Sequence, residues 1–550
     1  MNIIQQLQQS FTHHVHNLFP VEPSLLNNIA FTINVDENKK DFGDINSNAA
    51  MVLAQHLKRN PREVAQAIIA DFKHEYIEKV ELAGPGFLNL FLTVAALHEL
   101  VKQLDRGEQF FKLDASAPKH NYSVEFVSAN PTGPLHLGHG RGGIIGDMLG
   151  SVLRFLGHKV TKEFYVNDAG NQVKKLGLSF KARCQQELGM DVPLPEDGYQ
   201  GEYLVELAKE FIKSRHGHQL LDQPDTFFED YAKEKLLEQI KQTLISYGIH
   251  FDIWFSEKTL HMDNAIKTSI DTLNKKGFIY EKEGALWFKS TEFGDDKDRV
   301  VRKSSGEFTY VAPDIAYMQN KVTRGFDKLI IVLGHDHHGF VVRLQGLFKA
   351  LDLEPATLEA ILYQLVKMKA SGQLVRMSKR AGNIVTLHDV IETVGKDVAR
   401  FFYLNRKADA QLEFDLDLAL KQSEENPVYY VQYAYVRTNS ILNKAALEEQ
   451  FANISLADVT HIGTDEAFLI KKIVALKHIL ETIGSNYQTH LLTYYVLELA
   501  NAFHSYYGKN RVLDPENISL SRSRLLLIMR LRQTLQTCLT LLGISCPEKM

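Results

Sequence analysis

A run of closely spaced glycines, between Gly133 and Gly150, constrains the fold of this chain more than any other feature. Seven of the protein's 34 glycines fall there. A strand-like segment, YSVEFVS, precedes the run, and a second one, KVTKEFYV, follows it. Between them, apolar residues recur at helical spacing: Ile145, Met148, Leu149, Val152 and Leu156. Strand, glycine-rich turn, helix and strand are the parts of a βαβ unit, so we predict an α/β domain with a parallel sheet.

The turn also has the composition of a phosphate-binding loop. Glycine lets the backbone approach a phosphate group closely, and the following helix offers N–H groups and the positive end of its dipole. His136 and His139 lie three residues apart within the turn. Imidazole donors at that place would stabilise negative charge on a phosphoryl group during its transfer.

Two other interpretations of the turn stay open. The two histidines could serve only to cap the helix. The string GHGRGG, with Glu163 about 20 residues onward, also matches the fingerprint of a dinucleotide-dependent oxidoreductase. Pro131 and Pro134 stand against this second interpretation, because they push the turn away from the tight strand-to-helix form.

The chain of 550 residues is too long for one hydrophobic core, so we predict at least three domains. Residues 1–112 combine helical patterns with a hairpin around Gly84-Pro85-Gly86, which predicts an α+β module. Residues 113–410 hold the parallel sheet and a helical, charged insertion at about 175–280. Strand-like runs then return at YEKEGALWFKS, EFTYVAPDIAY and KLIIVLGHD. Residues 411–550 are almost wholly helical.

Composition and charge exclude several classes of protein. Apolar residues make up 45% and charged residues 23%, as in a soluble globular chain. No stretch reaches the about 18 apolar residues of a membrane span, and no secretory signal is visible. The net charge of −5 means that nucleic-acid binding would need local basic surfaces. Three widely spaced cysteines, Cys184, Cys538 and Cys546, argue against a disulfide scaffold and fit a reducing compartment, so we expect a cytoplasmic protein.

Two short motifs in this order resemble the signatures of class I aminoacyl-tRNA synthetases. His136-Leu-Gly-His139 resembles the HIGH signature, and residues 375–383, VRMSKRAGN, resemble the KMSKS loop, with Arg376 and Arg380 as departures from that pattern. The longer strings SVEFVSANPTGPLHLGHGRG, GHDHHGFVVR and NPVYYVQYAYVR are similar to arginyl-tRNA synthetases. The resemblance covers essentially the whole chain. It implies a Rossmann-like catalytic domain, an N-terminal α+β domain and a C-terminal all-α anticodon-binding domain.

The resemblance also implies the reaction and its partners. The chain would activate L-arginine with ATP and transfer it to the terminal adenosine of tRNA(Arg), and activation itself would require bound tRNA. Mg²⁺ would arrive with ATP, and we expect no protein-bound zinc, no membrane partner and a monomer. The catalytic residues implied are His136, His139 and Lys379, and the further ATP contacts implied are Gly138, Gly140, Met377 and Ser378.

Four residues match the family's pattern for binding arginine. An aspartate preceded four residues earlier by a tyrosine holds the guanidinium, and Tyr310 and Asp314 match this pair. An acidic residue and an asparagine before the HIGH turn hold the α-ammonium group, and Glu125 and Asn130 match them. Since a carboxylate accepts a fork of guanidinium N–H donors, a buried Asp314 would reject lysine. Packing or capping roles for the two acidic residues remain the alternative.

The helical part carries aromatic and basic residues together, and the resemblance implies that it binds the anticodon stem and loop. We predict RNA contacts at Tyr433, Arg437 and Tyr507, because unpaired bases stack on aromatic rings and arginines hold the phosphate backbone. The ordinary interpretation of tyrosines at this spacing is a helix core. Four late arginines are interpreted as a solvated helix face: Arg522, Arg524, Arg530 and Arg532.

The histidine cluster at residues 335–338 invites a metal interpretation. Adjacent residues at a strand end point in different directions, so we interpret it as the nucleotide-facing end of a strand rather than a zinc site. A non-catalytic RNA-binding relative is a further alternative. The joint presence of the catalytic and arginine-binding matches argues against it, because a site out of use need not keep them.

Overall fold

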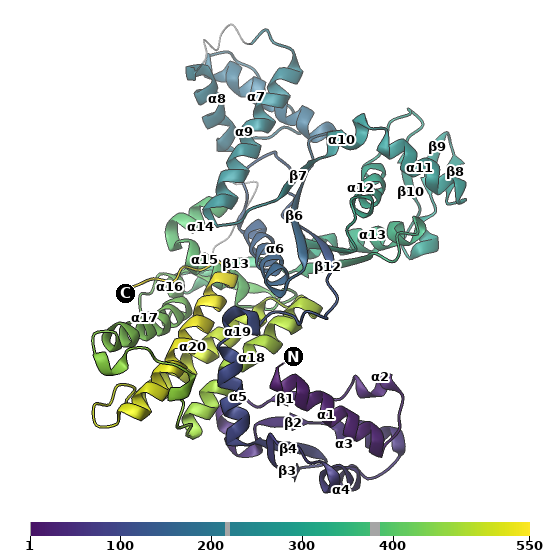
Figure 1. The fold of residues 1–550 in the computed structure, drawn as a ribbon. Coiled ribbons are helices and arrows are strands. Elements are labelled where there is room, and N and C mark those ends of the chain that lie inside the picture. The colour runs from purple at the N-terminus through teal and green to yellow at the C-terminus, as the bar shows by residue number, and fades with distance from the viewer. Residues whose placement is uncertain (1, 215–220, 375–385) are drawn as a thin grey trace.

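The fold is organised around a five-stranded parallel sheet with the strand order β12-β11-β5-β6-β7. The computed structural model describes residues 2–214, 221–374 and 386–550. The strands are β5 (Asn121–Phe126), β6 (Lys159–Val166), β7 (Ile253–Ser256), β11 (Lys328–Gly334) and β12 (Thr357–Tyr363). Helix α6 (Leu137–Leu156) joins β5 to β6 and lies over the sheet (Figure 1). The predicted βαβ unit is therefore confirmed.

Helix α6 packs tightly because several of its positions are glycine. Its five predicted apolar residues are buried to 1% exposure or less. A Cβ atom at Gly146 would lie 2.2 Å from Cγ of Phe126, and one at Gly142 would lie 2.5 Å from Cε1 of Tyr363. No side chain fits at such distances, so part of the glycine run serves close packing against β5 and β12.

Two insertions interrupt the sheet (Figure 1, top and right). The first consists of α7 (Asn171–Glu187), α8 (Glu202–Ser214) and α9 (Asp225–Ser246), with a hydrophobic core of its own. The second contains α10 (Glu257–Met262), α11 (Ala265–Lys275), α12 (Val311–Thr323) and an antiparallel sheet of β8 (Ile279–Lys282), β9 (Ala285–Phe288) and β10 (Arg299–Arg302). The predicted insertion at about 175–280 was wrong in one respect, because β7 inside it is the edge strand of the parallel sheet.

The expectation of a strand at EFTYVAPDIAY was also wrong. Most of this segment is the first half of helix α12. Its buried residues include Val311, Ala312, Ile315 and Ala316, which is the spacing of one helix face rather than the alternation of a strand. Pro313 fits because the first turn of a helix does not use its N–H groups.

The N-terminal part is an α+β unit, as predicted. Its antiparallel sheet has the order β1-β2-β4-β3, with β1 (Phe31–Ile33), β2 (Ile45–Ser47), β3 (Ile77–Ala83) and β4 (Phe87–Leu92). The helices are α1 (Ile3–Leu18), α2 (Pro23–Leu26), α3 (Ala49–Leu57), α4 (Pro61–Asp71) and α5 (Val94–Leu104). Strands β3 and β4 form the predicted hairpin, where Gly84 and Gly86 take positive φ values of 54° and 146°.

The C-terminal part is helical after a small sheet. That sheet has the order β14-β13-β15, with β13 (Val366–Ala370), β14 (Gln373–Leu374) and β15 (Leu412–Asp415). The helices are α14 (Leu387–Val394), α15 (Lys396–Leu404), α16 (Leu416–Ala419), α17 (Pro427–Ala445), α18 (Thr464–Asn486), α19 (His490–Lys509) and α20 (Ile518–Leu542). Within the described ranges, no helix has the length and apolar character that crossing a membrane requires.

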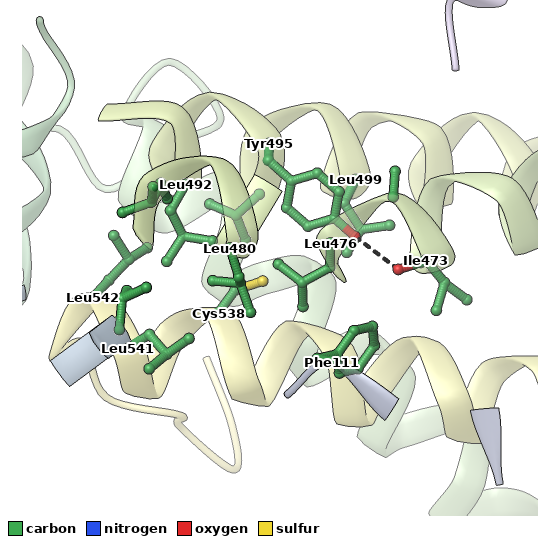
Figure 2. Close-up of a cluster of buried hydrophobic side chains, with 14 of the residues drawn as sticks. Phe111, Ile473, Leu476, Leu480, Leu492, Tyr495, Leu499, Cys538, Leu541 and Leu542 are labelled. Atoms are coloured by element: carbon green, nitrogen blue, oxygen red, sulfur yellow. Dashed lines mark hydrogen bonds between the residues drawn. The ribbon is translucent and has the colours of Figure 1, made fainter. Parts of the chain in front are cut away.

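Helices α18, α19 and α20 share one hydrophobic core (Figure 2). Leu476, Leu499 and Leu542 meet there, and Phe111 reaches it from the segment that follows α5. The hydroxyl of buried Tyr495 donates to the carbonyl of Lys472 at 2.8 Å. The N-terminal unit therefore packs on the helical domain rather than standing apart from it.

The four late arginines do not form the expected solvated face. The described side chains of Arg522, Arg524 and Arg530 are 22%, 13% and 15% exposed, and each pairs with a carboxylate from another element. Arg532 donates to Asn439 on α17. These arginines bind α20 to neighbouring elements. Their long side chains reach acceptors that lie far away in the sequence.

Candidate active site

The switch point of the parallel sheet lies between β5 and β11. The chain runs from β5 through β6 to β7 on one side, and from β11 to β12 on the other. Ligands of open parallel sheets bind at the carboxyl ends of such strands. The histidine turn follows β5, and the histidine cluster follows β11 in a short 3-10 helix (His335–His337) and helix α13 (His338–Ala350). Among the described residues, no group of three or more histidine, cysteine or acidic side chains could hold a metal ion.

The two histidines of the turn are joined through their Nδ1 atoms to the backbone. His136 is the N-cap of α6, where its Nδ1 accepts from the amide of Gly138 at 3.2 Å. Nδ1 of His139 accepts from the amide of His136 at 3.2 Å. The rings stack at 3.7 Å between centroids. Since Nδ1 accepts in each neutral ring, the proton lies on Nε2, the nitrogen that can donate to a phosphoryl oxygen. Both histidines therefore make helix-capping contacts through Nδ1 at the start of α6.

The structure describes some of the predicted ATP contacts and leaves others out. Gly138 and Gly140 lie in the first turn of α6. Met377, Ser378 and Lys379 lie outside the described residues. The first described residues after them return to the histidine turn, because the amide of Leu387 donates to the carbonyl of Leu135 at 2.8 Å.

Gly140 leaves no room for a side chain. A Cβ atom there would lie 2.5 Å from Cδ1 of Leu387 and 2.9 Å from the ring of Tyr403. Gly140→Ala is therefore expected to lower the free energy of unfolding by about 1–3 kcal/mol through overpacking. Gly508→Ala is the matched control, since nothing lies within 4 Å of its Cβ position in helix α19. Urea unfolding of both variants makes the comparison, and equal stabilities would contradict the packing described.

Three carboxyl groups interact through their charges, and two of them are predicted arginine ligands. Glu125 lies one residue before the end of β5 and is 7% exposed, while half-buried Asp314 lies in the first turn of α12. Burial raises the pKa of Asp314 well above its usual range; the charge of Arg343 opposes this, and the charges of Glu257 and Glu125 raise the pKa further. Such a site favours a cation, because a positive ligand would offset the mutual repulsion of the carboxylates.

Glu257, at the start of α10, is a member of this acidic group that the sequence did not indicate. Burial raises its pKa, and hydrogen bonds from Tyr165 and His261 oppose that shift. The hydroxyl of Tyr165 donates to Oε2 of Glu257 at 2.9 Å. No motif marks Glu257. It comes near Asp314 only because the second insertion folds so that α10 and α12 meet.

Lys321 neutralises part of the acidic group. Its fully buried ammonium donates to Oε2 of Glu125 at 2.7 Å and lies 3.5 Å from Glu163. Burial by itself would raise the pKa of Glu163, but hydrogen bonds from Arg324 and Tyr317 and the charge of Lys321 outweigh it and lower that pKa. Glu163 is fully buried in these pairs. It is therefore placed in a charge network and not at a ribose, which contradicts the dinucleotide interpretation.

The remaining predicted arginine ligands are both exposed. Tyr310 is the residue before α12 and is 68% exposed, with the guanidinium of Arg343 5.6 Å from its ring centroid. It lies four residues before Asp314, so both stand on one face of the helix start. Asn130 is exposed in the segment between β5 and the histidines.

The three residues predicted to contact RNA form one cluster on α17 and α19. The guanidinium carbon of Arg437 lies 4.6 Å from the ring centroid of Tyr433 and 5.0 Å from that of Tyr507. Arg437 also donates to the hydroxyl of Tyr433 at 2.7 Å. Tyr507 is 38% exposed. Neighbouring Tyr435 and Tyr506 are buried, as the core interpretation of tyrosines predicts.

Comparison with protein-family models agrees with this architecture. Residues 5–92 match the arginyl tRNA synthetase N terminal domain, residues 101–414 match the catalytic domain of class I (R) tRNA synthetases, and residues 431–550 match the DALR anticodon binding domain. The parallel sheet with paired histidines at its switch point is thus the catalytic domain of a class I tRNA synthetase.

Relatives that match over most of their length identify the family within this class. The arginine–tRNA ligase of Caldanaerobacter subterraneus is 44% identical and that of Bacillus subtilis 42% identical, over 94% and 93% of each chain. Arginyl-tRNA synthetase structures from Thermus thermophilus (19% identity, TM-score 0.76) and Plasmodium falciparum (20% identity, TM-score 0.78) share the fold over the whole of each chain. The chain belongs to the arginyl-tRNA synthetase family and is an enzyme that joins arginine to transfer RNA at the expense of ATP.

Proposed function

We propose that Asp314 and Glu257 bind the guanidinium of L-arginine, that Glu125 and Asn130 face its α-ammonium group, and that the ring of Tyr310 covers the side chain. The observation that carries this proposal is the group of three neighbouring carboxyls, in which burial and mutual repulsion raise the pKa of Asp314. L-arginine supplies two positive groups to such a site. Glu125 is already paired with Lys321, so Asp314 and Glu257 are left to accept from the guanidinium, whose positive charge would favour their ionised forms.

His136 and His139 bind the phosphates of ATP in this proposal, together with the backbone of Gly138 and Gly140. The carboxylate of arginine attacks the α-phosphorus, the bond from that phosphorus to the β-phosphate oxygen breaks, and pyrophosphate leaves. The Nε2 donors and the N-terminus of α6 stabilise the charge that develops. Lys379 is assigned to the same phosphates on its motif alone. Mg²⁺ is proposed to arrive with ATP, since it prefers phosphate and water ligands to a protein cage.

In the second step the terminal adenosine hydroxyl of tRNA(Arg) attacks the arginyl carbonyl and AMP leaves. We assign residues 411–550 to the anticodon stem and loop, and residues 1–112 to the outer corner of the tRNA. The Tyr433, Arg437 and Tyr507 cluster supports the first assignment, because it combines exposed aromatic surface with a guanidinium. A cytoplasmic monomer completes the proposal; light scattering with and without tRNA tests the monomer.

The experiment that tests these roles is exchange of labelled pyrophosphate into ATP, with and without tRNA(Arg). Wild type is expected to exchange with arginine, only when tRNA is present, and not with lysine. Lys379→Ala is expected to abolish exchange. Exchange without tRNA would leave the arginine site in place and overturn the tRNA requirement. Equal exchange with lysine would overturn the proposed arginine-binding role of the acidic group.

The affinity for arginine is expected to fall as the pH is lowered. Free Asp314 takes up a proton at a pH above its usual value of 3.8, because burial raises its pKa. A cation binds the ionised form, so binding releases a proton below that raised pKa, and the affinity then falls about tenfold per pH unit. Calorimetry in two buffers of different ionisation enthalpy measures the protons released. Asp314→Asn is expected to reduce this release and to leave the part that comes from Glu257, whose pKa burial also raises. An undiminished release would assign it to groups other than Asp314.

A further inference from the structure

Tyr247 connects the first insertion to the backbone that follows the second motif. It comes directly after helix α9 and is fully buried. Its hydroxyl donates to the carbonyl of Leu387 at 2.7 Å. The amide of Leu387 in turn donates to the carbonyl of Leu135, at 2.8 Å, and Leu135 directly precedes His136. One hydroxyl is thus two hydrogen bonds away from the histidine turn.

The amide of Leu387 can make this contact without breaking a hydrogen bond of its own helix. It is the first residue of α14, where N–H groups have no partner within the helix. Thr386 already caps α14 by accepting from the amide of Asp389 at 3.1 Å. The bond from Leu387 to Leu135 therefore holds two segments together, and Tyr247 binds the next peptide group, whose carbonyl belongs to the same residue.

Arg400 holds Tyr247 from the other side. It lies on α15 and is 1% exposed. Its Nη1 donates to the carbonyl of Tyr247 at 3.0 Å, and its Nε donates to the carbonyl of Leu542, the last residue of α20, at 2.7 Å. Its Nη2 pairs with Asp147 of α6 at 2.7 Å. One guanidinium thus joins the end of the helical domain, the residue after α9 and the helix that begins at the histidines.

We propose that Tyr247 is a positioning residue for ATP activation, and that Arg400 links it to the end of the helical domain. The relay runs from Leu542 through Arg400 and Tyr247 to Leu387 and then to the turn at Leu135. It acts on ATP through the backbone and touches no substrate. The inference rests on the proposed role of the histidine turn in binding ATP. A small shift of that turn changes the geometry of attack, on which activation depends steeply.

Tyr247→Phe and Tyr495→Phe form a matched pair for the test. Each removes one hydroxyl from a buried tyrosine that donates to a backbone carbonyl, and Tyr495 lies in the core of the helical domain (Figure 2). Both are expected to lower the melting temperature by similar amounts. Only Tyr247→Phe is expected to lower kcat/KM for ATP in pyrophosphate exchange, by about tenfold, and to weaken ATP binding measured by calorimetry, with the KM for arginine unchanged.

Arg400→Lys tests the link to the helical domain. Lysine keeps a charge opposite Asp147 but cannot reach all three partners. It is expected to lower kcat/KM for ATP as Tyr247→Phe does, and the double variant is expected to fall no further than either single one. Full additivity would overturn the relay, and equal kinetics for Tyr247→Phe and Tyr495→Phe would reduce Tyr247 to a structural role. Absence of exchange in wild type would instead overturn the proposed function, while the ATP affinities would still decide the relay.

Discussion

Asp314→Asn is expected to lower kcat/KM for arginine by about 10³-fold in pyrophosphate exchange. Asparagine has nearly the same shape as aspartate, but it removes the charge that we propose faces the guanidinium and introduces an N–H donor in its place. The KM for ATP is expected to stay unchanged, because the histidine turn does not depend on this residue. Asp298→Asn is the control, since Asp298 pairs with Tyr280 and Thr291 in the same insertion.

The same substitution is expected to keep or raise stability. The folded-state pKa of Asp314 lies above its unfolded value, so the folded protein loses stability as the pH rises through the usual carboxyl range toward that raised pKa. At neutral pH, asparagine removes this unfavourable ionisation. Loss of activity together with an unchanged or higher melting temperature would mark Asp314 as a binding residue. Loss of activity together with loss of stability would support the packing alternative.

His136→Asn is expected to lower kcat for exchange by about 10²-fold while the protein stays folded. Asparagine is a good N-cap, so its side-chain oxygen can replace Nδ1 as acceptor from the amide of Gly138. It cannot replace the Nε2 donor. His136→Ala removes both, and is expected to lose about 1 kcal/mol of stability in addition. Wild-type kcat in His136→Asn would show that the histidine only caps the helix.

The βαβ unit at the centre of the sheet could be predicted because its signal is local. The glycine run, the apolar spacing of α6 and the two flanking strands lie within one stretch of sequence, and each element favours the same βαβ unit. The role of the glycines between Gly133 and Gly150 could be predicted only in part. Gly142 and Gly146 face Tyr363 and Phe126 rather than a phosphate, and Tyr363 is distant in sequence.

The acidic group could be predicted only where motifs mark its members. Glu125 and Asp314 were found by resemblance, whereas Glu257 and Lys321 were missed, because their roles depend on the path of the second insertion. The helix at Asp314 was missed for a related reason. The residues that lead into it, Phe308-Thr309-Tyr310-Val311, are β-branched or aromatic and resemble a strand locally. Only burial within the second insertion reveals the helical face.

The arginines of α20 show that the composition of a helix does not predict which of its charged residues are paired. A basic run on a late helix is typical of a solvated face, yet Arg522 and Arg524 pair with Asp458 and Glu466 from other elements. Their acceptors lie about 60 residues earlier in the chain, beyond the reach of helix periodicity. By contrast, Tyr433 and Arg437 lie four residues apart on one helix, so their contact follows directly from spacing.

The most direct test of the arginine site is a crystal structure of the protein with L-arginine bound. We expect the guanidinium nitrogens within hydrogen-bond distance of the carboxylates of Asp314 and Glu257, with the α-ammonium group facing Glu125 and Asn130. The α-carboxylate would then point toward His136 and His139, where ATP is proposed to bind. An arginine bound elsewhere, or one whose guanidinium leaves both Asp314 and Glu257 without contact, would contradict the account.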